Sequence, residues 1–549
     1  MQSDKYIFNY DQRTATAELE DIELGIKAIT FESTPSTSVL AYLAARYSRS
    51  KLSIVETYNQ LLNQNEEDAS TEHSDKLSED RLEKMFHGYG HASVGDQAQV
   101  IICLENVPQY LIEVIFNWVN VVAGQARSTR YQDFTSSDNS NLCVTIPTHL
   151  EIDKEWVEEY DSLMQQGITN FTKLLPLTEI AQGQQYGLTL DGTDNKSKVS
   201  SNHVRSLDTA RYLLPMGLRS SVALFINARE LSDLISQLQG SSNTYNNAVA
   251  ALILNLLTND DYVYKKQTSS LIRHAAARFG HYKTDELIYN LIKAEGLEPT
   301  FDHTKSITQS VLTYSESNFY SLFSHALQLY YPRILDLDLG TEDEPIVTRI
   351  LKEISEVVFN TSHHDLPGPI VQTGAISIHG IMDIGAARDL NRHRSIRRWF
   401  PYLSDFYPTV KDLMEVNVSS KFTTCPYLDT PPLDKLKVIY EQTLSNYYYD
   451  VQSLILKGLE LNINKDVLNE YLKYLLPMGH LVNYSVHLDI KSLLYIAHLR
   501  TAPGGHIAYR IIVDTWVQDL AEENDFFAPL LQALSTVDPE SIQQYFCRD

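Results

Sequence analysis

The residues best suited to chemistry are concentrated between Arg388 and Arg398. Six of the eleven residues in this stretch are basic, whereas the 549-residue chain is acidic, with a formal net charge of −25. A dense group of cations in an acidic protein raises the positive potential at one place, and guanidinium groups match phosphate oxygens well. The stretch therefore predicts a site for a phosphate-bearing anion.

The spacing within this basic cluster also suggests why it would need a ligand. On a helix, Arg388 and Arg392 would lie one turn apart, as would Arg394 and Arg398, and like charges at that spacing repel. A bound anion is the simplest compensation. A solvated basic face or a salt-bridged edge of the core is the alternative that composition leaves open.

The triplet Arg392-His393-Arg394 resembles the Arg-His-Arg segment of the flavin-dependent thymidylate synthases. In that family a Ser follows eight residues later, where this chain has Tyr402. The other half of the family motif, Ser-x-Arg-Tyr, is matched by Ser128-Thr129-Arg130-Tyr131, and there Trp118-Val119-Asn120 occupies the Arg-His-Arg position. Each half of the chain thus keeps what the other has lost.

Further stretches follow the same family pattern along most of the chain. They are His91-Ala92-Ser93, Ala44 to Ser48, Ala210-Arg211, Leu214-Pro215 and Asn227 to Leu231, which includes Arg229.

The resemblance implies an FAD-dependent enzyme that methylates C5 of a uracil nucleotide such as dUMP, with NADPH and methylenetetrahydrofolate. It implies FAD contacts from His91, Ser93, Arg392, His393 and Arg394, and nucleotide contacts from Ser128, Arg130 and Arg229. The reaction needs no side-chain nucleophile and no metal. The catalytic residues that the resemblance implies, Arg392, His393 and Arg130, would therefore act by binding, orienting and polarising the reactants.

Several positions depart from the family pattern. Gln518 falls where the family carries an Arg that polarises the pyrimidine, Ala126 replaces a Glu, and Asp389 replaces a Gln. Losing a cation beside a developing enolate removes an electrostatic contribution of several kcal/mol. A catalytically degenerate binding or scaffold protein is therefore the main alternative, and a flavoprotein with unrelated redox chemistry is a third.

Other family-like positions have ordinary structural explanations. Asp96 stands where the family has Glu, and Arg500 and Arg510 match a family pair of arginines. Surface helix charges would look the same.

An internal repeat is visible without reference to any family. Tyr212-Leu-Leu-Pro-Met-Gly217 recurs as Tyr474-Leu-Leu-Pro-Met-Gly479, an offset of 262 residues. This predicts duplicated domains at residues 1–293 and 305–549, with a linker at 294–304. The expected fold is α+β, with two tandem domains that each wrap a small antiparallel sheet in helices.

Hydrophobic periodicity locates individual elements. It predicts a strand over 100–104, a helix over 112–123, a core helix over 248–257, and amphipathic helices after each copy of the repeat, at 231–238 and 493–500. The polar segments 63–80 and 191–202 are expected to be insertions, the second a flexible loop.

Composition narrows the class of protein. No long apolar run or signal core is present, and the four cysteines lack metal or redox spacing, so we expect a cytoplasmic protein without membrane contact. The acidic charge argues against nucleic-acid binding. By analogy with the family's tetramer, we expect a homodimer of fused chains, with composite sites that pair Ser128, Arg130 and Arg229 with Arg392, His393 and Arg394.

Overall fold

The computed structural model divides the chain into two compact units that do not follow sequence order. One unit comprises Met1–Glu105, Trp118–Ala126 and Ser221–Gly296, and the other comprises Asn106–Asn117, Arg127–Ser220 and Leu297–Asp549. Apart from isolated positions, the structure describes residues 6–11, 16–21, 26–31, 54–63, 99–118, 123–129, 142–146, 150–258, 344–360, 376–404, 409–414, 417–431, 433–502 and 505–534. The predicted linker lies outside these residues except for Ala294, so the predicted domain boundary stays a prediction.

The first unit contains two small antiparallel sheets. Residues 6–31 supply a three-stranded sheet in the order β1-β2-β3, and a second sheet, in the order β4-β6-β5, lies largely in the same unit. The elements are β1 (Tyr6–Asp11), β2 (Thr16–Asp21), β3 (Ile26–Phe31), α2 (Ile54–Asn63), β4 (Gln99–Pro108), β5 (Ala123–Ala126), β6 (Arg219–Asn227), α7 (Ala228–Gly240) and α8 (Thr244–Thr258). The predicted strand over 100–104 is confirmed within β4.

Helix α7 shows how local sequence builds this unit. The Asn227 side chain caps the helix by accepting a hydrogen bond from the Glu230 N–H, and the apolar positions Leu231, Leu234 and Leu238 are fully buried. The predicted amphipathic helix is confirmed. The predicted helix over 248–257 is also present as α8, although Leu252 on it is exposed.

The second unit is built on a four-stranded antiparallel sheet in the order β7-β8-β10-β9. Its strands are β7 (Val311–Leu312), β8 (Ile376–Asp383), β9 (Arg397–Trp399) and β10 (Leu481–Leu488). Its helices are α4 (Gln109–Trp118), α5 (Lys154–Gln185), α6 (Lys196–Ala210), α12 (Glu344–Asn360), α14 (Ile384–Leu390), α15 (Val410–Met414), α16 (Asp434–Glu460), α17 (Lys465–Leu475), α18 (Ile490–Thr501), α19 (Ile507–Glu523) and α20 (Ala528–Ala533), with short 3₁₀ turns between them.

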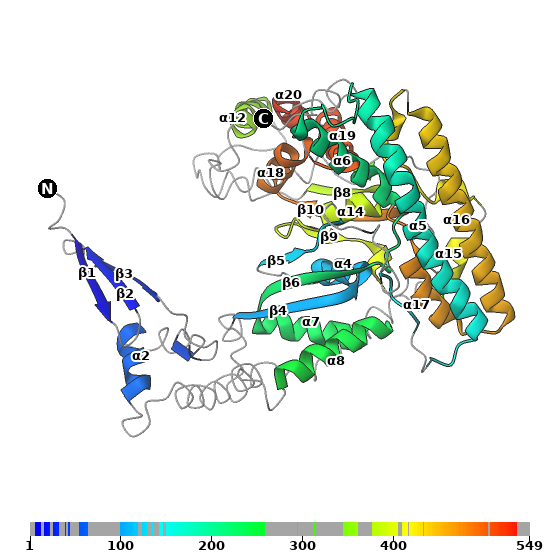
Figure 1. Ribbon diagram of the computed structural model, residues 1–549. Coiled ribbons are helices and arrows are strands. Elements are labelled where there is room, and N and C mark those ends of the chain that lie inside the picture. Colours follow the sequence, from blue (N-terminus) through cyan, green and yellow to red (C-terminus); the bar gives the residue numbers. More distant parts are fainter. Residues whose placement is uncertain are drawn as a thin grey trace. The chain divides into compact units, whose positions relative to one another are not determined.

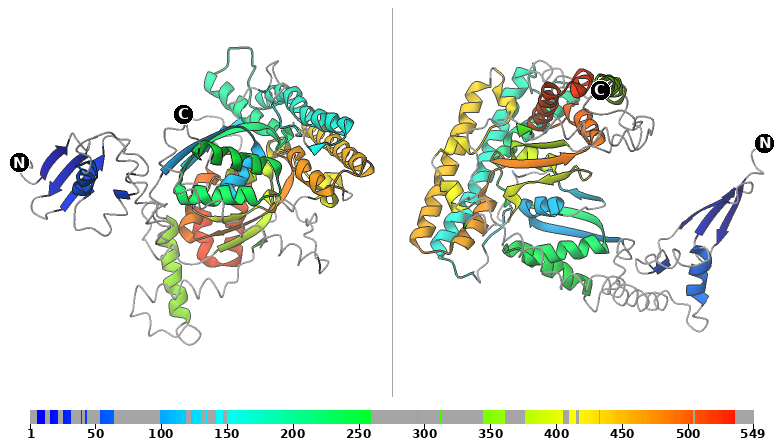
Figure 2. Two further views of the ribbon diagram at one scale, coloured as in Figure 1. Left: turned by 90° about the horizontal axis from the view of Figure 1, so that it is seen from below. Right: turned by 180° about the vertical axis from the view of Figure 1, so that it is seen from behind.

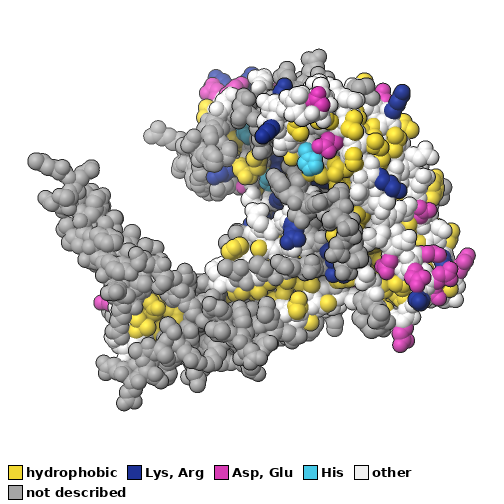
Figure 3. All heavy atoms as spheres, viewed as in Figure 1, with side chains coloured by type: hydrophobic (Ala, Val, Ile, Leu, Met, Phe, Trp, Pro, Cys, Tyr) yellow, Lys and Arg dark blue, Asp and Glu magenta, His cyan; other side chains and the backbone are white. Residues whose placement is uncertain are grey.

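Two long helices of this unit, α5 and α16, run side by side (Figures 1 and 2). The Trp156 indole N–H donates to the Leu454 carbonyl at 2.9 Å, and the Thr178 and Tyr440 hydroxyls lie 2.7 Å apart. Acidic side chains gather at the end of this pair where α5 begins (Figure 3), and there Lys457 pairs with both Glu155 and Glu159. A mainly apolar seam with buried hydroxyl contacts therefore joins helices from distant parts of the chain.

The two copies of the repeated hexapeptide occupy matching places in the order of elements. Each follows a pair of helices, α5–α6 or α16–α17, and each leads into a central strand, β6 or β10, that is followed by a helix. The predicted helix after the second copy is confirmed as α18.

Some sequence expectations were wrong. Residues 191–202 are not a flexible loop throughout, because α6 begins at Lys196 after Asn195 caps it through the Ser197 N–H. The helix predicted over 112–123 ends at Trp118, and Ala123 begins β5. The basic cluster is not one helix either, since α14 ends at Leu390 and Arg397 and Arg398 lie in β9.

The α+β expectation, with helices around small antiparallel sheets, is confirmed. Among the helices that the structure describes, none combines the length and apolar character that crossing a bilayer requires.

Candidate functional site

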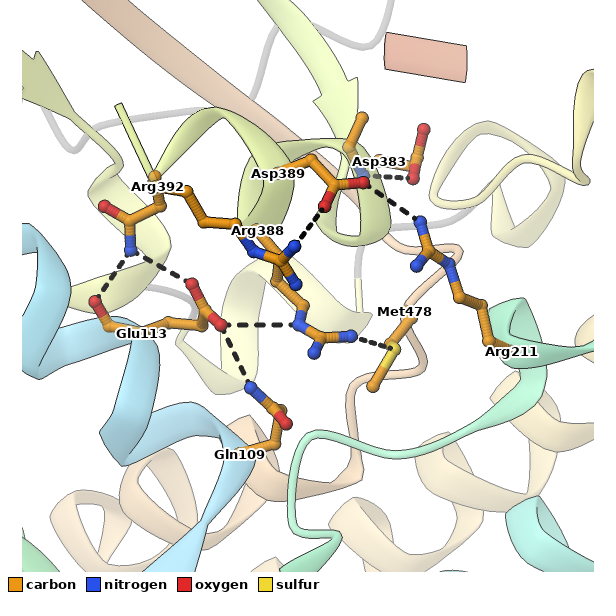
Figure 4. A network of polar contacts seen from close by, with 10 residues as sticks. Gln109, Glu113, Arg211, Asp383, Arg388, Asp389, Arg392 and Met478 are labelled. Atoms are coloured by element: carbon orange, nitrogen blue, oxygen red, sulfur yellow. Dashed lines mark hydrogen bonds and ion pairs between the residues drawn. The ribbon is translucent and has the colours of Figure 1, made fainter. Parts of the chain in front are cut away.

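The basic cluster begins in α14, which is short and buried. The Asp383 carboxylate caps its first turn by accepting from the Ala386 N–H at 2.8 Å (Figure 4). Burial raises the pKa of Asp383 to about 6. Beyond Leu390 the chain turns and enters β9, so the basic side chains point into several different environments.

Arg388 is compensated inside the protein. Its Nε lies 3.3 Å from Oε1 of Glu113, and both side chains are buried. The Gln109 side chain donates to the same carboxylate at 3.0 Å, and the Asn391 side chain donates to Glu113 Oε2 at 3.0 Å (Figure 4). This ion pair joins α4 to α14, and it neutralises the charge of Arg388 without an external anion.

Asp389 links two arginines. It lies 3.4 Å from Arg211 Nη2 and 3.5 Å from Arg392 Nη1, and Arg211 also pairs with Asp208 (Figure 4). The Arg392 side chain is 50% exposed, whereas that of Asp389 is 10% exposed. A buried carboxylate therefore orients an arginine whose guanidinium can reach a ligand.

His393 is buried and packed among aromatic rings. Its Nε2 accepts a hydrogen bond from Arg500 Nε at 2.9 Å, and its ring meets those of Tyr495 and Tyr509 edge-on. Burial, and then the charges of Arg500 and Arg398, lower the pKa of His393 to about 3. The imidazole is therefore neutral at physiological pH and acts as an acceptor that holds Arg500.

Arg394 and Arg398 fasten the turn to α4. The Arg394 guanidinium lies over the Phe116 ring, 5.6 Å from its centroid. Arg398 donates to the Asn391 side chain at 2.7 Å, to the His393 carbonyl at 2.9 Å and to the Phe116 carbonyl. Together with Arg388 and His393, four of the six basic residues thus have clear structural contacts.

The remaining predicted residues are distributed across both units. Ser128 follows β5 and is half-buried in the unit that contains Arg392, whereas Arg229 is half-buried in the first turn of α7 in the other unit. His91, Ser93, Asp96 and Arg130 lie outside the described residues. The composite site therefore stays a prediction.

The departures from the family pattern have defined places. Ala126 ends β5, and Tyr402 is fully buried. Gln518 is exposed and donates to Asp514 at 2.7 Å. Arg510 is buried and donates to the Thr501 carbonyl at 3.0 Å, which is a structural role.

Glu113 and Asn391 are important parts of this site that the sequence patterns did not indicate. Glu113 is 275 residues from Arg388, and no local pattern indicates that they meet. Within the described residues, no group of three or more His, Cys, Asp or Glu side chains could hold a metal ion.

The fold and the network define a helix-rich α+β protein with an oriented, solvent-reachable arginine at the end of a buried helix. Residues 31–260 match the family model described as thymidylate synthase complementing protein. The resemblance to this family is therefore confirmed over that part of the chain, which contains Ser128, Arg130 and Arg229. FAD is the cofactor of this family.

Individual relatives are distant. A UPF0159 protein of Chlamydia pneumoniae is 23% identical over 508 residues, which are 88% of this chain and 87% of that protein. A solved structure of the flavin-dependent thymidylate synthase ThyX from Helicobacter pylori, complexed with FAD and dUMP, shares 17% identity and covers 41% of this chain and 100% of its own, with a TM-score of 0.30. A second structure of ThyX from Helicobacter pylori with FAD and dUMP shares 18% identity and covers 41% and 99%, with a TM-score of 0.29.

Proposed function

We propose that this protein is an FAD-dependent, thymidylate synthase-like enzyme. It would methylate C5 of a uracil nucleotide such as dUMP, using NADPH and methylenetetrahydrofolate. The observation that carries the proposal is Arg392, which belongs to an Arg-His-Arg segment, is half exposed and is oriented by the buried Asp389. The family match over residues 31–260 supports it.

The residues present fit FAD in part. Arg392 would hold a phosphate through its guanidinium fork, and Arg394 lies beside it in the same turn. His393 does not offer a free ring face, since it is 5% exposed and meets two tyrosines. When bound, FAD would supply hydride transfer from NADPH.

The chain's own residues would bind and orient the reactants. Ser128, Arg130 and Arg229 would hold the nucleotide, and Arg392 would hold an anionic group at a defined angle. A neutral His393 would not donate a proton, and it would act by holding Arg500. His91 and Ser93 would add contacts to the flavin.

The proposal includes the assembly and its setting. Two duplicated domains, at residues 1–293 and 305–549, would form a fused pair, and a cytoplasmic homodimer of fused chains would form a pseudo-tetramer. The matching order of elements around Tyr212–Gly217 and Tyr474–Gly479 supports the duplication.

The alternative function is flavin or nucleotide binding without turnover. Gln518 favours it, because this neutral side chain is exposed and bonded to Asp514 where the family carries a cation. A binding or scaffold protein could keep the arginine network and lose methyl transfer.

Turnover of the purified protein distinguishes these functions. The protein is reconstituted with FAD and given dUMP, NADPH and methylenetetrahydrofolate, and dTMP is measured by chromatography. We expect dTMP to form and to be lost in Arg392→Ala. FAD binding without dTMP would support the flavin-binding alternative, and absence of FAD binding would refute the proposed enzyme and favour a scaffold protein.

A further inference from the structure

The two copies of the repeated hexapeptide bond to each other reciprocally. The Met216 N–H donates to the Leu476 carbonyl and the Met478 N–H to the Leu214 carbonyl, both at 2.9 Å. The Gly217 N–H donates to the Tyr474 carbonyl at 2.7 Å, and the Gly479 N–H to the Tyr212 carbonyl at 3.0 Å. Each bond has its counterpart 262 residues away, so the segments pair as two like surfaces around a local two-fold axis.

The same symmetry extends to α4 and α14. The Gln109 N–H donates to the Leu218 carbonyl at 2.8 Å, and the Ile384 N–H donates to the His480 carbonyl at 3.0 Å. The first N–H of each helix thus donates to the carbonyl of the residue that follows one hexapeptide. The two helix starts, Gln109 and Ile384, are 275 residues apart. Glu113 and Arg388, each four residues after the helix start, are therefore equivalent positions.

These equivalent positions carry opposite charges and touch each other. Glu113 and Arg388 pair at 3.3 Å with side chains only 5% and 4% exposed. Gln109 and Asn391 donate to the Glu113 carboxylate, and Arg388 Nη1 donates to Met478 Sδ at 3.2 Å (Figure 4). Pairing two identical copies through this surface would instead bury Glu against Glu or Arg against Arg.

We infer that this surface has become specific for unlike halves. The half that contains α4 and Tyr212–Gly217 pairs with the half that contains α14 and Tyr474–Gly479, because the two halves carry opposite buried charges. Neither half would pair with a second copy of itself. Buried like charges without compensation are strongly unfavourable, and such repulsion is an effective source of specificity. The inference does not depend on the proposed function.

Charge reversal in the full-length protein tests this. Glu113→Arg and Arg388→Glu should each lower the thermal midpoint by about 10 °C or more, whereas the double reversal should recover most of that loss. Reversing the more exposed pair Lys457 and Glu159, whose side chains are 25% and 48% exposed, is the control and should change the midpoint by about 2 °C or less. A double reversal no more stable than the single ones would overturn the inference.

Co-expression provides a second test if the single variants do not fold alone. The Glu113→Arg chain has two cations at the paired positions, and the Arg388→Glu chain has two anions. If the two chains exchange halves, each paired position again faces the opposite charge. We expect soluble mixed dimers, detected with two affinity tags and by light scattering, only when both chains are present. Like charges that assemble as readily as opposite ones, or no recovery of soluble protein on co-expression, would contradict the inference.

Discussion

Arg392 is the basic residue whose position best suits ligand binding, and that position depends on Asp389. Asp389→Asn keeps the shape of the side chain but removes the charge that lies between Arg211 and Arg392. We expect FAD to bind about 3- to 10-fold more weakly, which corresponds to the net contribution of about one ordinary hydrogen bond. Equilibrium titration of flavin fluorescence measures this.

Asp514→Asn is the control for that variant, because the Asp514 carboxylate likewise accepts from a side chain, that of Gln518, but lies outside the arginine network. It should leave FAD affinity unchanged. Equal affinities for wild type and Asp389→Asn would show that Asp389 does not position Arg392 for binding.

His393 predicts a pH dependence of stability. Its pKa is about 3 in the folded protein, below its usual value of 6.5, so its stabilising contribution is complete above pH 6.5 and is lost as pH falls toward 3. One extra proton bound on unfolding gives a slope of about 1.4 kcal/mol per pH unit in that window. In His393→Asn this contribution to the slope should disappear in urea unfolding measured from pH 7 to 4.

Slopes rather than absolute stabilities are compared, because the substitution also alters packing with Tyr495 and Tyr509. Burial of Asp383, which raises its pKa to about 6, acts in the opposite direction and is present in both proteins. Identical slopes would show that folding does not lower the pKa of His393.

At the scale of elements, the hexapeptide ladder depends on close backbone approach at Gly479. A Cβ there would lie 2.7 Å from the Thr423 carbonyl oxygen and 3.2 Å from that of Tyr212. Gly479→Ala should therefore destabilise the protein by about 2 kcal/mol in urea unfolding. Gly505→Ala, whose nearest neighbour would be 3.4 Å away, should cost clearly less, and equal losses would refute this explanation.

Local patterns predicted the elements better than they predicted the site. Leu231, Leu234 and Leu238 identified α7, since their spacing alone defines a buried face. The end of α14 at Leu390 was missed because charge spacing suggested a longer helix, while the actual turn is fastened by Arg398 and Asn391. The pairing of Glu113 with Arg388 joins positions 275 residues apart, and such contacts leave no trace in local periodicity.

At the scale of the whole molecule, the compensation within the basic cluster matters most. The like charges of the cluster predicted that an external anion was needed. In the structure, Glu113 pairs with Arg388 and Asp389 pairs with Arg392, so two of these charges are compensated within the protein. The half-exposed Arg392 still offers donors to a ligand. We therefore propose one type of composite site, in which Arg392 from the second half holds FAD and Ser128 and Arg130 from the first half hold the nucleotide.

The number of FAD molecules bound per chain tests this account most directly. Equilibrium dialysis of the purified protein against FAD, with Arg392→Ala as the site variant and Lys457→Ala as a control outside the arginine network, measures stoichiometry and affinity together. We predict one high-affinity FAD per chain, weakened at least tenfold by Arg392→Ala and unchanged by the control. Two equal sites per chain, or an affinity that Arg392→Ala does not alter, would contradict it.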